Sequence, residues 1–194
     1  RYLDEIHTTA ASHNRVFVIE VMGHKVGHIC LSAGIAAGAD VILLPEIPYD
    51  IEKIAKAIKT REKAGKNFSI IACAEGAISI EDAKLAKKEY KAIVKARNGR
   101  SVAYEVAEEL EDYLDSEIRV SCIGHAQRGG QPCPYDRFIS TRFGVAGARL
   151  VINQDYGKLV VLKNNQITSI PLSQSACKLK YVDPEGPEIQ DAKE

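Results

Sequence analysis

The chain has 194 residues, of which 45% are hydrophobic and 27% are charged, and its formal net charge is +0. A chain of this length forms one domain, or one domain with part of a second. Because its charges balance, we expect no general attraction to nucleic acid or to an anionic membrane. No apolar run approaches the roughly 18 residues that a membrane-spanning helix needs. The sequence begins with Arg1 rather than Met and has no signal-peptide core, which indicates a piece of a longer protein.

The five cysteines are odd in number, form no CxxC pair and lie mostly among apolar residues. Such cysteines indicate reduced thiols in a cytoplasmic protein rather than disulfides or zinc ligands. His24 and His28 lie four residues apart, but this pair alone does not make a metal site. We therefore expect no metal site in this chain.

Four apolar runs rich in β-branched residues predict buried strands at residues 16–21, 41–44, 68–73 and 118–123. Helical periodicity and N-cap residues predict helices between them, at residues 29–37, 51–64, 80–98 and 102–114. Residues 1–12 begin as a weak helix and continue from Thr8 as a polar connector. Strands that alternate with helices are typical of parallel sheets covered on both faces. We therefore predict an α/β fold with a mostly parallel three-layer sheet of about four strands.

The C-terminal part has a different pattern. It predicts an amphipathic helix over residues 135–153 and a β-hairpin over residues 158–170. We assign residues 1–124 to the main domain, residues 125–172 to a segment that crosses to a second domain, and residues 173–194 to a C-terminal tail. Since that second domain is not in the sequence, the 135–153 helix should expose apolar surface.

Three of the predicted strands end in glycine-containing turns that carry polar side chains. His125 and Arg128 follow the last strand, and Glu75 follows the third. The carboxyl ends of parallel strands meet at one edge of a sheet, where ligands bind in such folds. Arginine and histidine suit an anionic ligand, and a carboxylate accepts hydrogen bonds from ligand hydroxyls. From the residues alone, two other interpretations remain. The glycine-rich turn could be an ordinary tight turn whose arginine is exposed to solvent, and Glu75 could be an ordinary acidic residue of a loop.

These strand ends together resemble the phosphofructokinase family. The likeness rests on the stretch from Ser12 to Gly23, on Ala74-Glu75-Gly76, and on Gly124-His-Ala-Gln-Arg-Gly-Gly130 with Pro134-Tyr-Asp-Arg137 after it. It runs from about residue 8 to residue 170. The family transfers a phosphoryl group to the 1-hydroxyl of fructose 6-phosphate, in glycolysis, at a site between two similar α/β domains. The resemblance implies a fragment of such a two-domain enzyme, namely its fructose-6-phosphate-binding half.

The resemblance also implies roles for individual residues. It places Met22 and Gly23 along the sugar pocket, has Glu75 accept from sugar hydroxyls, and has His125 and Arg128 hold the substrate in the same subunit. Residues that would reach a neighbouring subunit's 6-phosphate are Arg15 and Arg119. These two imply a homo-oligomer, a dimer or a tetramer.

The family's catalytic base and donor-phosphate loops have no counterpart in this sequence. No residue here can be assigned as that base. The resemblance implies a donor, ATP or pyrophosphate, that is bound with Mg²⁺ by the absent half. We expect the fragment alone to bind sugar phosphate weakly and not to turn over.

Two departures from the family pattern affect these expectations. His24 stands where the family has an arginine near the transferred phosphate, and a histidine is shorter and only partly charged near neutral pH. The chain is also longer than short bacterial members between Glu75 and Arg119, within residues 77–118. This insertion resembles the longer branch of the family, which contains pyrophosphate-dependent members, so the donor stays open.

The resemblance further implies an effector site between subunits in short bacterial members. The matching positions here are His7, Asp40, Ala64, Lys66 and Phe68. Ala64 and Phe68 cannot bind phosphate, so we expect little response to the usual nucleoside diphosphate or phosphoenolpyruvate effectors. Two alternatives to the hypothesis of a 6-phosphofructokinase remain. One is a non-catalytic sugar-phosphate-binding regulatory or oligomerisation module, and the other is a kinase of the same superfamily with another acceptor.

Overall fold

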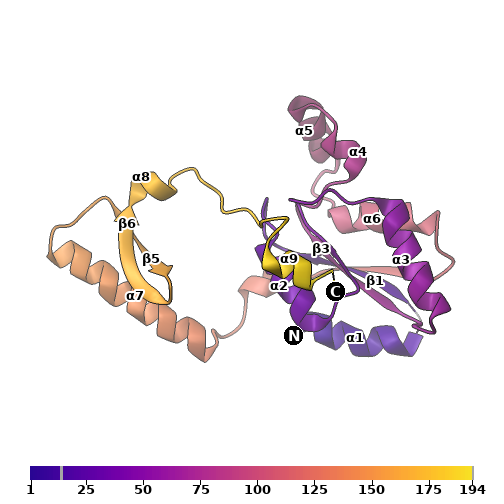
Figure 1. The fold of residues 1–194 in the computed structure, drawn as a ribbon, viewed down its shortest axis with the longest axis horizontal. Helices are drawn as coiled ribbons and strands as arrows, with labels where there is room; N and C mark the ends of the chain where they lie inside the picture. The colour runs from indigo at the N-terminus through magenta and orange to yellow at the C-terminus, as the bar shows by residue number, and fades with distance from the viewer. Residues whose placement is uncertain (14, 194) are drawn as a thin grey trace. The chain divides into compact units, whose positions relative to one another are not determined.

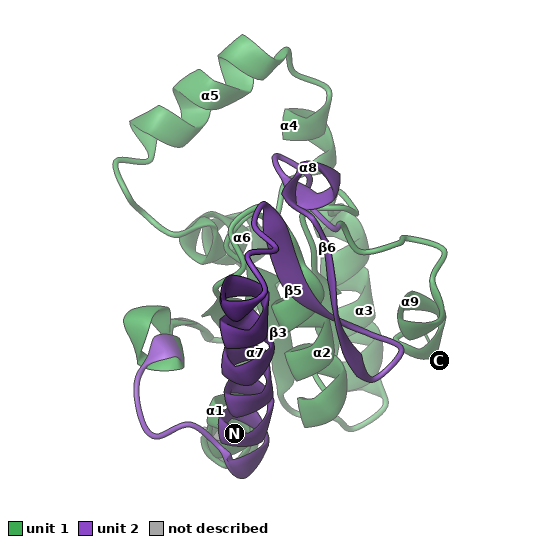
Figure 2. Cartoon of the chain, turned by 90° about the vertical axis from the view of Figure 1, so that its left-hand side faces the viewer, with its two compact units in different colours: residues 1–127, 181–194 green, residues 128–180 purple. Residues whose placement is uncertain are grey.

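The computed structural model describes residues 1–13 and 15–193, and their contacts divide the chain into two compact units. The first unit contains Arg1–Gln127 together with Tyr181–Glu194. The second contains Arg128–Lys180 (Figure 2). Each unit has its own sheet and helices, so the two are described separately.

The first unit is built on a parallel sheet, as predicted. Within residues 1–13 and 15–193, its four strands are β1 (Val16–Val21), β2 (Val41–Leu43), β3 (Ser69–Ala74) and β4 (Ile118–Cys122). They lie in the order β2-β3-β1-β4. In the register, Val16 of β1 lies beside Ser69 of β3 and Ile118 of β4. This order places the end of β1 between the ends of β3 and β4.

Helices cover both faces of this sheet, which confirms the three-layer prediction (Figure 1). The helices are α1 (Tyr2–His13), α2 (His28–Ala37), α3 (Ile51–Lys63) and α6 (Val102–Glu111). Val18 and Ile71 pack against residues of α3 and α6. Ile19 on the opposite face packs in a cluster with Leu3 of α1. Alternate strand residues therefore enter two separate cores, because successive side chains of a strand point to opposite faces.

Two helices differ from the prediction. Helix α1 continues through Thr8 to His13, where we expected a polar connector, because Ala10 is fully buried against the sheet and belongs to the same helical face as Leu3. The predicted helix over residues 80–98 is instead divided into α4 (Ile80–Ala83) and α5 (Lys87–Ala96). The Glu89 carboxylate accepts a hydrogen bond from the Ala86 amide at 3.0 Å, which begins α5 afresh.

The C-terminal residues also differ from the expected tail. Val182 and Ile189 are buried and pack with Leu31 of α2 and with Leu44. Ile189 lies in the short helix α9 (Pro187–Asp191). The Val182 amide donates to Glu46 Oε1 at 3.0 Å. Two isolated apolar residues in a charged stretch form no periodic pattern, so the sequence did not predict this packing.

The N-cap of α3 offers a direct test of the helix assignment. Asp50 Oδ1 accepts from the amides of Glu52 at 3.1 Å and Lys53 at 3.3 Å. Asp50→Ala should lower the free energy of unfolding by about 1 kcal/mol, and Asp50→Asn should retain most of it. Urea unfolding measures both changes. Equal midpoints for wild type and Asp50→Ala would contradict the cap.

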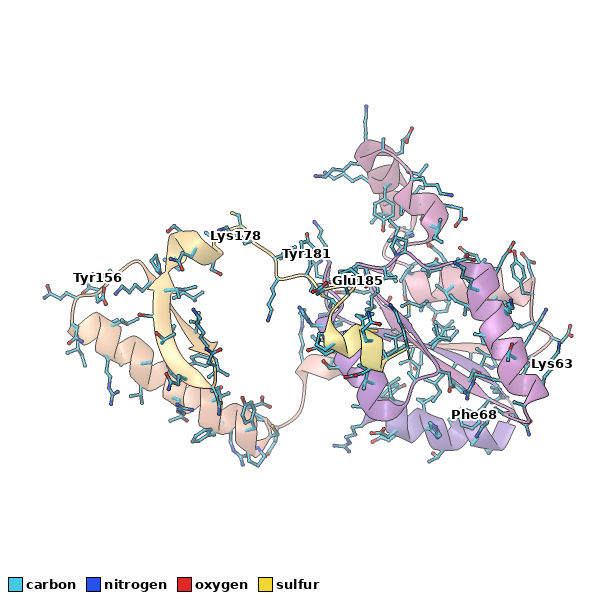
Figure 3. The ribbon with its side chains drawn as sticks, viewed as in Figure 1. Lys63, Phe68, Tyr156, Lys178, Tyr181 and Glu185 are labelled. Carbon is cyan, nitrogen blue, oxygen red and sulfur yellow. The ribbon has the colours of Figure 1, made fainter. Side chains whose placement is uncertain are left out.

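The second unit contains one long helix and a β-hairpin. Its elements are α7 (Pro134–Ile152), β5 (Lys158–Lys163), β6 (Gln166–Pro171) and α8 (Leu172–Ser175). Asn164 and Asn165 turn the hairpin with φ values of 48° and 60°, which asparagine tolerates well. Tyr156 lies in the loop that joins α7 to β5, and its side chain is exposed (Figure 3).

Helix α7 exposes its apolar side chains, as predicted. All 19 of its residues are described, and none is buried. Phe138 is 59% exposed and Ile152 is 77% exposed. A monomeric domain seldom leaves such side chains open along one helix, so this helix is suited to packing against another surface.

Candidate active site

The carboxyl ends of β1 and β3 come together at one edge of the sheet. The Glu75 amide donates to the Val21 carbonyl at 3.0 Å, which continues the parallel pairing beyond the last strand residues. Met22 and Gly23 follow β1 at this edge, and the short 3₁₀ segment η1 (Gly124–Arg128) follows β4. The structure therefore brings together the turns that the sequence analysis selected.

Glu75 holds the turn after β1. Its Oε1 accepts from the Gly23 amide at 3.0 Å and also from the His24 amide. His24 has φ 56°, a left-handed conformation that is unfavourable for a residue with a side chain. Two hydrogen bonds to a carboxylate offset this cost, because bonds to charged groups are the stronger ones. The same side chain that we expected to bind ligand hydroxyls thus also fixes the turn.

Gly76 allows the two turns to approach closely. A Cβ atom at this position would lie 2.3 Å from the His24 carbonyl oxygen and 3.2 Å from Pro45 Cγ. Gly23 is confined similarly, since its Cβ would lie 2.5 Å from the Val26 carbonyl oxygen. At both positions glycine is required because a Cβ atom would collide with a backbone carbonyl oxygen.

Gln127 connects the end of β4 to the turn after β1. Its Oε1 accepts from the Met22 amide at 3.2 Å, and its Nε2 donates to the Gly124 carbonyl at 3.4 Å. This glutamine lies within the glycine-rich turn, and the sequence alone indicated no role for it. His125 beside it is exposed, and so is Arg128, the first residue of the second unit.

Glu20 is a second carboxylate that the sequence analysis missed. It lies in β1, beside Cys73 of β3 and Cys122 of β4, and Ser101 Oγ donates to its Oε2. Burial raises the pKa of Glu20, the Ser101 hydrogen bond lowers it, and the nearby charge of Glu75 raises it further. A single acid within an otherwise apolar strand was the signal that could have identified it.

Both carboxylates line one cavity. Its volume is about 210 Å³, and its walls consist of Glu20, Glu75, Val94, Arg97, Gly99, Arg100, Ser101 and Val102. Carboxylates accept hydrogen bonds, while guanidinium groups only donate them. A ligand with several hydroxyl groups can form hydrogen bonds with the carboxylates and with the guanidinium groups, because each hydroxyl both donates and accepts.

The raised pKa of Glu20 predicts a pH effect on stability. The folded protein holds this proton more strongly than the unfolded chain does, so stability should fall as the pH rises above the ordinary value of 4.5. Glu20→Gln removes the titration and can keep the bond from Ser101. Its stability relative to wild type should therefore increase between about pH 4 and about pH 7 in urea unfolding experiments. Parallel profiles for the two proteins would contradict this assignment.

Arg15 and Arg119 lie at the opposite edge of the sheet. Arg15 precedes β1, and both arginines contact the Glu117 carboxylate. The hydrogen bond from Arg15 lowers the pKa of Glu117, and the charge of Arg119 adds to this effect. At about 3.3 Å per strand residue, Arg15 lies about 20 Å from Val21 at the carboxyl end of β1, and Arg119, which pairs with Phe17, lies about 13 Å from it. Both arginines therefore lie well away from Glu75 within this chain.

The five expected effector positions include residues with other contacts. Asp40 Oδ1 lies 2.6 Å from Arg61 Nη2, and its Oδ2 accepts from the Ile70 amide at 2.8 Å. His7 packs edge-to-face on Phe68, with ring centroids 4.8 Å apart. The Asp40 carboxylate is therefore already paired within its own chain. The weak response to effectors stays a prediction.

Across residues 1–13 and 15–193, no helix is both long and apolar enough to cross a membrane. In the same part of the chain, no group of three or more His, Cys, Asp or Glu side chains is placed to hold a metal ion.

Comparison with known proteins gives matches over most of the chain. The family model described as Phosphofructokinase matches residues 1–151. An ATP-dependent 6-phosphofructokinase of Spirochaeta thermophila is 48% identical over 191 residues, which cover 98% of this chain and 52% of that protein. Its namesake in Chloroflexus aurantiacus is 44% identical over 182 residues, covering 94% of this chain and 49% of that protein. The chain thus spans about half the length of these curated relatives.

Solved structures of similar fold agree with these matches. Phosphofructokinase from Saccharomyces cerevisiae superposes with a TM-score of 0.73 and 31% identity, covering 90% of this chain and 22% of that one. Pyrophosphate-dependent phosphofructokinase from Marinobacter aquaeolei gives a TM-score of 0.72 at 18% identity, covering 98% and 52%. The second likeness concerns the fold alone.

Proposed function

The chain belongs to the phosphofructokinase family, and we propose that it forms the sugar-phosphate-binding half of a 6-phosphofructokinase. The observation that carries the proposal is the position of Glu75, which joins the turn after β1 and lines a polar cavity. The reaction is transfer of a phosphoryl group from a donor to the 1-hydroxyl of fructose 6-phosphate. We place it in the cytoplasm, in agreement with the reduced cysteines.

Each residue of the proposed site has a physical role. Glu75 accepts hydrogen bonds from sugar hydroxyls, and Met22 and Gly23 form the adjoining wall. His125 and Arg128 bind the phosphate group of the substrate, since a guanidinium fork matches phosphate oxygens in pairs. These residues orient the acceptor. We assign no catalytic base within this chain.

We propose that the site is completed by a second subunit. Arg15 lies about 20 Å and Arg119 about 13 Å from the carboxyl end of β1, and both contact Glu117. That separation favours a role at a neighbour's site over a role at their own. Each subunit of a homo-oligomer, a dimer or a tetramer, would then receive two arginines for the 6-phosphate from its partner.

We propose ATP, with Mg²⁺, as the donor, because the curated relatives are named ATP-dependent. A part of the protein outside this chain would bind both. The donor supplies the phosphoryl group, and the residues described above only hold the acceptor. His24 lies in the turn beside the proposed sugar pocket, where its imidazole can donate one hydrogen bond to the transferred group.

Calorimetric titration of the full-length protein with fructose 6-phosphate and with glucose 6-phosphate tests the proposal. We expect clear binding of fructose 6-phosphate and much weaker binding of glucose 6-phosphate. A preference for glucose 6-phosphate would indicate a kinase with another acceptor. Binding without phosphorylation would indicate a non-catalytic module, and binding of neither sugar would contradict the proposal.

A further inference from the structure

One wall of the cavity beside Glu75 has no role in the proposed function. It is formed by Val94 of α5 and by Arg97 and Arg100, which lie between α5 and α6. Helices α4 and α5 are fully described, and neither contains a buried residue. They extend beyond α6 in Figure 1. Helices α4 and α5 therefore contribute side chains to the cavity without adding to the hydrophobic core.

Arg97 anchors α4 and α5 to α6. Its side chain is 11% exposed, and it lies 2.6 Å from Glu105 of α6 and 3.5 Å from Asp82 of α4. It also lies over the Tyr90 ring, 5.9 Å from the centroid. These contacts join α4, α5 and α6, so its guanidinium is largely committed to the fold.

Arg100 is differently placed. Its Nη1 donates to Glu108 Oε2 at 3.1 Å, and its Nη2 donates to Glu108 Oε1. The guanidinium lies 5.3 Å from the ring centroid of Tyr104. A guanidinium has five N–H groups, so about three remain available after this paired contact. Glu108 and Tyr104 fix the orientation of the side chain at the cavity wall, and a fixed donor loses less entropy when it binds.

We propose that Arg100 is a specificity-determining residue of the sugar-phosphate site. The inference rests on the proposed function. An N–H group of Arg100 donates to the oxygen of a ring hydroxyl, and that hydroxyl donates its own hydrogen to Glu75 or Glu20. The protein would therefore recognise one hydroxyl both as a hydrogen-bond acceptor and as a hydrogen-bond donor. An epimer that points the hydroxyl elsewhere loses both of these charge-assisted hydrogen bonds at once, which costs more than the loss of one apolar contact.

The experiment compares fructose 6-phosphate with its epimers at carbon 3, psicose 6-phosphate, and at carbon 4, tagatose 6-phosphate. For each sugar, kcat/KM is measured on the full-length protein, wild type and Arg100→Ala. We expect kcat/KM for fructose 6-phosphate to fall roughly tenfold in the variant. The kcat/KM for fructose 6-phosphate is then divided by that for each epimer, and at least one of these two ratios should fall by a similar factor. Lys91→Ala, an exposed cation on α5 that does not line the cavity, should change neither quantity.

Glu108→Gln is a second variant that tests positioning. Both partners of this pair are about half exposed, so both variants should fold. Loss of the carboxylate frees Arg100 to rotate, and the same ratio should fall by a smaller factor than in Arg100→Ala. A merely structural role would change stability but not the ratio between epimers.

The outcomes separate this inference from the proposed function. If Arg100→Ala leaves both ratios within about twofold of wild type while the enzyme phosphorylates fructose 6-phosphate, Arg100 does not set specificity and the proposed function stands. If the wild-type protein acts on none of the three sugars, the proposed function fails and this inference fails with it.

Discussion

Replacing Glu75 by alanine should lower kcat/KM for fructose 6-phosphate by roughly 10- to 150-fold, because a charge-assisted hydrogen bond contributes about 1.5–3 kcal/mol. The same change leaves the Gly23 and His24 amides without their acceptor. The free energy of unfolding should therefore also fall, by about 1–3 kcal/mol. Steady-state kinetics and urea unfolding measure the two effects.

Two further variants separate the two roles of Glu75. Glu75→Gln keeps an oxygen that can accept from the Gly23 amide but loses the charge. It should retain more of the stability than of the activity. Glu111→Ala, at an exposed glutamate of α6, serves as the control and should change neither. Full activity in Glu75→Ala would show that the sugar binds elsewhere.

Mixing two variants with weakened substrate binding should restore part of the activity if the site is shared between subunits. Arg119→Ala and Arg128→Ala should each weaken sugar-phosphate binding by roughly 10- to 150-fold. A mixed oligomer combines the intact Arg128 of one subunit with the intact Arg119 of its neighbour. For random dimers, roughly a quarter of all sites should then be complete.

The reason for this expectation is the position of the two arginines that contact Glu117. They lie at the amino ends of the strands, whereas Glu75 lies at the carboxyl ends. Activity is measured after subunits are dissociated together and reassembled, with each variant treated alone as the control. If the mixture is no more active than the separate variants, Arg119 does not serve a neighbouring site.

The sequence predicted the main layers of the fold because its strands are continuous apolar runs. Val16 to Val21 and Ser69 to Ala74 are buried on both faces, so their composition alone identifies them. Asp50 similarly marked the start of α3. Such signals are local, since each depends on a few consecutive residues.

Other features depend on contacts between distant residues and left little trace in the sequence. Ile189 is buried only because residues 181–193 return to the first unit. Gln127 has a role because β4 lies beside β1, and Glu20 because Ser101 begins α6 beneath it. The resemblance to a family selected Glu75 and Met22 as candidates, but the structure was needed to find the cavity that both Glu75 and Arg100 line.

The most direct test of the account is the product formed from fructose 6-phosphate by the full-length protein. Purified protein is incubated with fructose 6-phosphate, Mg²⁺ and either ATP or pyrophosphate, and the sugar phosphates are identified by ³¹P NMR. We predict fructose 1,6-bisphosphate with ATP, and its loss on replacing Glu75 by alanine. Absence of the bisphosphate with both donors, from protein that is folded, would contradict the account.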